Sequence, residues 1–196
     1  MTRVQYAKGA TLRGTLAWLD GAMGSLAARR LVQKALGRPE ASGLAAVGAT
    51  AEVEYATLVR LWTAIDAALG ASRSGWAADA GAHSITSVGQ QLYGGILAKR
   101  SPAEFLLQSV SLFQLFYRPG DMTVVESRDG YAVLRLEGFD PITGLFCERL
   151  RGGLVAALGA AGGAQGRVRH VRCALEGDAF CEWELRWVSG HGATTG

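Results

Sequence analysis

The feature that most constrains the fold is a change in the spacing of apolar residues near Gly120. Before this residue, apolar side chains recur three and four positions apart, as in amphipathic helices. After it, MTVVESRDGYAVLRLEG and RVRHVRCALEGDAFCEWELRW each contain two strand-like runs joined by a turn, and one helical stretch separates them. This order predicts an α+β protein. About five N-terminal helices should pack on a four-stranded antiparallel sheet with one crossover helix, a ββαββ C-terminal half.

Capping residues and helix breakers set the expected helix limits. Ser101-Pro102 is typical of a helix start, and the apolar residues of the following helix, 101–117, nearly encircle it. We therefore expect this helix to be central and buried. The other N-terminal helices are expected over 9–24, 25–36, 50–69 and 75–100.

The domain organisation follows from the rest of the chain. The Ala/Gly-rich stretch 40–49 and the GAAGGAQG run at 159–166 are expected to be loops. No repeat or linker divides the sequence, so a single domain over 1–188 is predicted. Its parts are a helical portion at 1–70 and a core at 75–188, followed by a disordered tail at 189–196.

Composition argues against several classes of function. The formal net charge of +3 is spread along the chain and is too small to indicate a nucleic-acid partner. No run approaches the ~18 apolar residues of a transmembrane helix, and the N-terminus lacks the pattern of a signal peptide. Three cysteines without a secretion signal indicate free thiols and a cytoplasmic protein.

The last hairpin has a register that can be predicted from its sequence. Centring the turn on Gly177 places Cys173 opposite Cys181 and Arg172 opposite Glu182. The same register places His170 opposite Glu184 and Val171 opposite Trp183. Cys173, Cys181, Trp183 and Leu185 then point to the core, because alternate residues of a strand share a face.

The three cysteines leave more than one interpretation open. Cys147 lies on the crossover helix and can approach the interior that Cys173 and Cys181 face, so a three-thiolate zinc site is one hypothesis. Structural zinc sites take four ligands, and no histidine is predicted on the same face. A disulfide between Cys173 and Cys181 is disfavoured in a reducing compartment. The simplest interpretation is that all three are small apolar core residues.

The ending VRHVRCALEGDAFCEWELRW resembles the signature of the 4-vinyl reductase (V4R) domain, in which a cysteine, a Gly-Asp turn and a second cysteine precede the final strand. This resemblance covers about residues 85–188. Over 3–188 the chain is similar to an uncharacterised myxobacterial family related to that domain, through GATLRGTLAWLD, LFQLFYRPG and CEWELRW. The resemblance implies the architecture shared with haem nitric-oxide-binding (H-NOX) domains and TRAPP vesicle-tethering subunits. It also implies a sensory module with a pocket for hydrophobic small molecules between helices and sheet.

The haem-binding features of H-NOX domains are not matched. The corresponding helix, LLQSVSLFQLFYRPG, contains no histidine, and the strand YAVLRLEG keeps Tyr131 and Arg135 at a different spacing and without the serine of the propionate-binding motif. Haem is therefore disfavoured as a cofactor. No Gly-x-Ser-x-Gly turn, phosphate loop or dinucleotide fingerprint is present, so an enzyme is not indicated.

Three functions remain as hypotheses. The first is a non-haem sensory or regulatory domain that binds a small hydrophobic molecule. The second is a homodimeric interaction module for an unknown protein partner, with Trp18 and Leu26 on its contact face. The third is a cysteine-based zinc or redox site. The residues expected to line the pocket of the sensory domain are Trp76, His83, Tyr93, Phe113, Phe116, Cys147, Cys173, Cys181 and Trp183.

Overall fold

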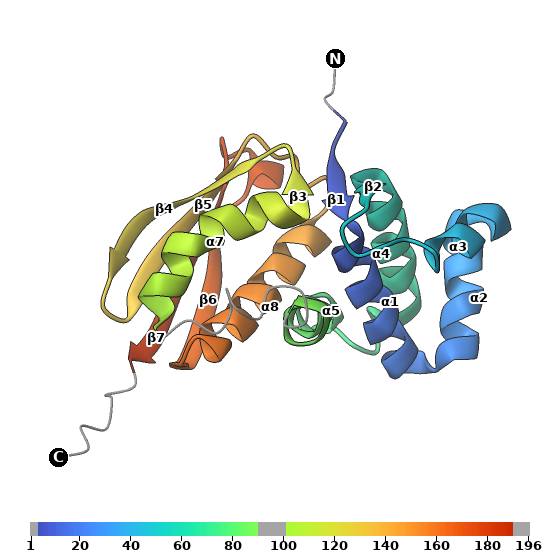
Figure 1. Cartoon of the computed structure of the whole chain (residues 1–196), viewed down its shortest axis with the longest axis horizontal. Coiled ribbons are helices and arrows are strands. Elements are labelled where there is room, and N and C mark those ends of the chain that lie inside the picture. The colour runs from blue at the N-terminus through green and yellow to red at the C-terminus, as the bar shows by residue number, and fades with distance from the viewer. Residues whose placement is uncertain (1–3, 90–100, 190–196) are drawn as a thin grey trace.

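The computed structural model describes residues 4–89 and 101–189; for residues 88–89, 107–112 and 189 it describes the backbone only. Figure 1 shows two halves side by side, with helices from the first part of the chain on one side and a curved sheet on the other. The first half contains β1 (Tyr6–Lys8), α1 (Gly9–Met23), α2 (Ser25–Leu36), α3 (Arg38–Leu44), β2 (Glu52–Glu54), α4 (Tyr55–Leu69), α5 (Trp76–Ser84) and a π-helical turn, η1 (Ile85–Gly89).

The second half is the predicted sheet with its crossover helix. Its elements are α7 (Pro102–Phe116), β3 (Tyr117–Arg118), β4 (Asp121–Arg128), β5 (Tyr131–Glu137), α8 (Gly144–Ala160), β6 (Gly163–Arg172), a 3-10 turn, η2 (Ala174–Glu176), and β7 (Cys181–Ser189). The four long strands are antiparallel in the order β4-β5-β7-β6. α7 packs along β4 and α8 along β6. The α+β class and the ββαββ order are therefore confirmed.

Several local expectations were wrong. Part of the expected loop 40–49 belongs to α3, which ends at Leu44, and β6 already begins at Gly163, inside the expected connector. The helix predicted from Thr50 begins at Tyr55, because residues 52–54 form β2. β2 pairs with β1, which also pairs with β3, in a second sheet that joins distant parts of the chain.

The predicted start of α7 is confirmed, but α7 is not the central, fully buried helix that was expected, because Ala103, Glu104 and Gln114 on it are exposed. The Ser101 hydroxyl accepts a hydrogen bond from the backbone N–H of Glu104 at 3.3 Å. The C-terminal part of the expected helix 75–100 lies outside the described residues, as does all of the expected tail after Ser189. No helix in the described part of the chain is long and apolar enough to cross a membrane.

Glycines let α5 and α8 pack backbone against backbone. A Cβ added at Gly81 of α5 would overlap the carbonyl oxygen of Arg149, and one added at Gly152 of α8 would overlap the carbonyl oxygen of Ala78. In Figure 1 α8 lies between α5 and the sheet. The contact between α5 and α8 therefore joins the helical half to the sheet half.

An aromatic cluster fills the same junction. The buried ring of Tyr55 lies 5.0 Å from that of Phe139, 5.9 Å from that of Phe146 and 6.2 Å from that of Tyr117. The Tyr55 hydroxyl donates a hydrogen bond of 2.7 Å to the carbonyl oxygen of Pro141, so its polar end is satisfied. The two halves consequently share one hydrophobic core.

Candidate metal centre

A β-bulge in β6 changes the predicted register of the last hairpin. Arg172 pairs with Glu182, as predicted, but the next pairs are His170 with Trp183 and Arg169 with Glu184. The predicted pairs of His170 with Glu184 and of Val171 with Trp183 were therefore wrong. Val171 is the extra residue of the bulge, and one extra residue exchanges the two faces of a strand. His170 consequently lies on the inner face of the sheet.

Four potential metal ligands meet on that inner face. The sulfur atoms of Cys147, Cys173 and Cys181 and one imidazole nitrogen of His170 all lie within 4.8 Å of one another. Cys147 comes from α8, His170 from β6, Cys181 from β7, and Cys173 from the residue before η2. All three cysteines are buried free thiols. The expected juxtaposition of the cysteines is therefore present, and the structure adds a fourth ligand.

The hairpin turn holds two of these ligands in place. The Asp178 carboxylate accepts a hydrogen bond of 2.8 Å from the backbone N–H of Cys173, and the N–H of Ala174 donates one of 3.4 Å to the Cys181 sulfur. Gly177 closes the turn with φ 97°, in the left-handed region that glycine adopts at low cost. The Gly-Asp pair of the sequence motif therefore positions cysteines.

The imidazole of His170 is held by stacking. Its ring lies 4.8 Å from the Trp183 ring, with 15° between the planes. The Nε2 atom of His170 is buried and has no hydrogen-bond partner in the described part of the chain. A buried nitrogen of this kind is available as a metal ligand.

The cluster also favours a thiolate. A hydrogen bond from the Cys147 thiol, followed by the proximity of His170 and the Ala174 N–H, lowers the pKa of Cys181. The same hydrogen bond, together with burial, raises the pKa of Cys147. Burial raises the pKa of Cys173. A thiolate is the form in which cysteine binds a metal.

The donor set fits a tetrahedral zinc ion. In a zinc site with Zn–S bonds of about 2.3 Å, ligand sulfurs lie about 3.8 Å apart, so a small inward movement of these side chains would complete the coordination. Three cysteines and one histidine make a closed set without an open position, which is the composition of structural sites.

The residues expected to line a ligand pocket lie in different parts of the structure. Trp76 packs on Trp18 and donates a hydrogen bond of 2.8 Å to Asp66 within the N-terminal helices. His83 lies half-buried on α5, and Phe113 and Phe116 lie on α7. Tyr93 is outside the described residues. Only Cys147, Cys173, Cys181 and Trp183 are gathered in the metal cluster, and whether the set lines a pocket stays a prediction.

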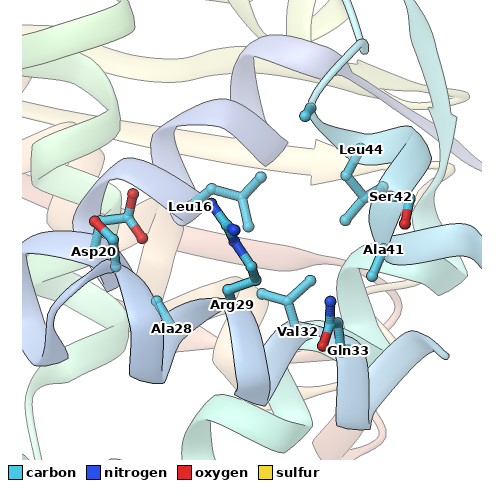
Figure 2. Close-up of a pocket in the computed structure, with 11 residues that line it drawn as sticks. Leu16, Asp20, Ala28, Arg29, Val32, Gln33, Ala41, Ser42 and Leu44 are labelled. Atoms are coloured by element: carbon cyan, nitrogen blue, oxygen red, sulfur yellow. The ribbon is translucent and has the colours of Figure 1, made fainter. Parts of the chain in front are cut away.

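A surface hollow lies elsewhere. It has a volume of about 420 Å³ and lies between α1, α2 and α3. Figure 2 shows its lining, to which Leu16 and Val32 contribute apolar side chains and Asp20 and Arg29 contribute charges. None of the expected pocket residues lines it. The spacing of apolar residues in α1 and α2 indicates helices with a buried face, and this pattern contains no signal for a hollow at the surface.

The fold is that of H-NOX domains. An H-NOX protein from S. oneidensis in the Fe(II) ligation state matches with a TM-score of 0.71 and 12% identity, over 92% of this chain and 95% of that chain. An oxygen-binding H-NOX domain related to soluble guanylate cyclases matches with a TM-score of 0.68 and 12% identity, over 92% and 94%. Unliganded Fe(II) H-NOX from K. algicida matches with a TM-score of 0.66 and 13% identity, over 92% and 96%. No family model and no curated protein matches the sequence.

The described residues do not fit a haem. Arg135 lies on the outer face of the sheet and is paired with Glu182 at 3.0 Å, while the Tyr131 ring is covered by the guanidinium of Arg128. His170 belongs to the cysteine cluster. α5, which carries His83, touches α8 backbone to backbone, which leaves no width for a porphyrin between these two helices.

Proposed function

We propose that this protein is a non-haem, ligand-binding regulatory domain whose sheet half is held together by a structural zinc ion. The observation that carries the zinc assignment is the convergence of Cys147, His170, Cys173 and Cys181 within 4.8 Å. The ion would join α8, β6 and β7 at one point. In such a site the binding free energy of the metal contributes directly to the stability of the fold.

Two observations support the regulatory part of the proposal. The fold is shared with H-NOX domains, one of which is described as an oxygen-binding domain related to soluble guanylate cyclases. The C-terminal segment VRHVRCALEGDAFCEWELRW resembles the 4-vinyl reductase domain, and this resemblance implies a sensory role. The ligand proposed for this chain is a small hydrophobic molecule.

Metal analysis tests the zinc site. The purified protein should contain one zinc ion per chain, and the metal-free protein loaded with Co²⁺ should show the thiolate charge-transfer and d–d bands of a tetrahedral centre. His170→Ala and Cys181→Ser should lose most of the metal. His83→Ala, which changes the other described histidine, should keep it. Wild-type protein that neither contains zinc nor gives the cobalt spectrum would contradict the assignment.

Ligand binding is tested separately. Native mass spectrometry of the zinc-loaded protein should detect a non-covalently bound small molecule, or an added hydrophobic one, at a one-to-one ratio. Protein that stays free of every hydrophobic molecule offered would contradict the sensory function and leave the zinc site standing.

Homodimerisation belongs to the same proposal. Leu26 at the start of α2 is 65% exposed and lies where the contact face was expected. Sedimentation should give a dimer for the wild type and a monomer for Leu26→Glu, and a monomeric wild type would contradict dimerisation.

A further inference from the structure

A single charged side chain lies among the buried residues that the structure describes. Arg149 of α8 is 4% exposed, and the other buried polar side chains are three threonines. Its Nη2 donates a hydrogen bond of 3.4 Å to the Ser84 hydroxyl, and its guanidinium carbon lies 4.7 Å from the centre of the Trp62 ring. Arg149 therefore reaches from the sheet half into the helical half.

This guanidinium has no counter-charge among the residues that the structure describes. Its Nε and Nη1 atoms are buried without a hydrogen-bond partner in the described part of the chain. All 17 aspartate and glutamate residues of the sequence lie among the described residues, and none of them forms an ion pair with Arg149. The ionisable groups that act on its charge are Tyr117 and Tyr55. Burial raises the pKa of both hydroxyls, so they stay neutral.

Arg149 remains charged in spite of its burial. A guanidinium keeps its proton at neutral pH even in a protein interior, because its positive charge is delocalised over three nitrogens. A buried charge without a partner is strongly unfavourable, and the aromatic face of Trp62 offsets only part of that cost. An anion that is not part of this chain would remove the imbalance.

The surroundings select the kind of anion. One guanidinium with neutral hydroxyls nearby matches a group with a single negative charge, whereas a phosphate carries up to two charges and is usually bound by several donors. Among those hydroxyls, Thr11 interacts with the hydroxyl of Tyr117, and Thr15 accepts a hydrogen bond of 3.3 Å from Trp62. The Trp62 ring that Arg149 contacts lies 5.8 Å from the Tyr55 ring, which lies 5.9 Å from the Phe146 ring, and these buried rings favour an apolar body.

We propose that Arg149 binds the carboxylate of a small apolar monocarboxylic acid at the junction between α4, α5 and α8. This inference rests on the proposed ligand-binding function and names the chemical class of the ligand. Carboxylate binding to the guanidinium provides specificity, and contact with the aromatic rings provides hydrophobic burial. Because Arg149 bridges the two halves, an acid bound there would also couple them.

Paired acids and amides test the proposal. Benzoate and hexanoate are titrated into the zinc-loaded full chain beside benzamide and hexanamide, at constant ionic strength, with Trp fluorescence and calorimetry as the measurements. Each acid should bind at least about 10-fold more tightly than its amide, because the amide carries no negative charge and offers the guanidinium one acceptor oxygen instead of two. Arg149→Met should weaken acid binding by about 10- to 100-fold and amide binding by only a few-fold.

Two further variants separate binding from folding. Arg149→Lys keeps the charge and should bind acids with intermediate affinity. Arg151→Met changes an arginine of the same helix that pairs with Glu148 at the surface, and it should bind like the wild type. Zinc content and circular dichroism verify that each variant is folded.

The possible results are distinguishable. Equal affinity of acid and amide, or acid binding that is unchanged in Arg149→Met, would overturn the role of Arg149 and leave the ligand-binding function intact. Failure of all four probes to bind the wild type would count against both proposals.

Discussion

His170 and Trp183 stack face to face across β6 and β7, with 4.8 Å between their ring centroids. This pairing exists because Val171 forms a bulge, which places His170 on the inner face of the sheet with the three cysteines. Without the bulge, the strand would present His170 to the outer face, where Arg169 and Glu184 lie. A single extra residue thus adds a fourth potential metal ligand to the three thiols.

Asp178 should contribute to metal affinity without touching the metal. Its carboxylate fixes the backbone N–H of Cys173 at 2.8 Å and so orients a ligand. Asp178→Ala should weaken zinc binding by about 10-fold, as is usual when a group supporting a ligand is lost. Asp178→Asn keeps an acceptor oxygen and should remain within a few-fold of the wild type. Competition with a chromogenic chelator measures both, and equal affinities for the two variants would show that the turn does not orient Cys173.

Acid should release the zinc and destabilise the sheet half together. Protons compete with the metal for three thiolates and an imidazole, so zinc affinity must fall as the pH is lowered. Half of the metal should leave between about pH 4 and 6, and the melting temperature should fall by about 10 °C over the same interval, because bound metal stabilises only the folded chain. A zinc indicator and circular dichroism follow the two changes. Metal release without a change in melting temperature would show that the ion does not support the fold.

The sequence predicts those parts of the fold that depend on local patterns. Periodicity and turn residues gave the helices, the two hairpins and the convergence of Cys147 with Cys173 and Cys181. The bulge at Val171 was missed, because the charge pairs of the hairpin fit a regular ladder equally well. The start of α4 was also misplaced, since Glu52–Glu54 reads as the first turn of a helix until β1 is present to pair with it. The lack of an ion-pair partner for Arg149 could not be predicted either, because it depends on which side chains surround Arg149 once α4, α5 and α8 pack together.

Substitution of two glycines should test the contact between α5 and α8. A methyl group at Gly81 or Gly152 would meet a backbone carbonyl that cannot move without shifting a whole helix. Gly81→Ala and Gly152→Ala should each destabilise the protein by about 3 kcal/mol or more.

Gly159, also in α8, provides the control, because nothing lies within 4 Å of a Cβ added there. Gly159→Ala should therefore stabilise by about 0.5 to 1 kcal/mol, because alanine is the better helix former. Urea unfolding measures all three, and similar values at the three positions would contradict the close packing.

Replacement of Arg149 should stabilise the ligand-free protein. The pKa of Arg149 falls from 12.5 to about 10 on folding, so the unfolded chain binds more protons between these values and stability rises with pH across that window. Below pH 10 the whole free-energy cost of burying the charged guanidinium is present, and a pKa shift of this size corresponds to about 3 kcal/mol.

Arg149→Met removes the charge but also the contact with Trp62, which leaves a net gain of about 2 kcal/mol and a melting temperature about 5 °C higher at pH 7. The difference between variant and wild type should shrink as the pH is raised above 10. Thermal unfolding of dialysed, ligand-free protein measures this, with Arg151→Met as the control. A lower melting temperature for Arg149→Met would show that Arg149 stabilises the fold without any anion.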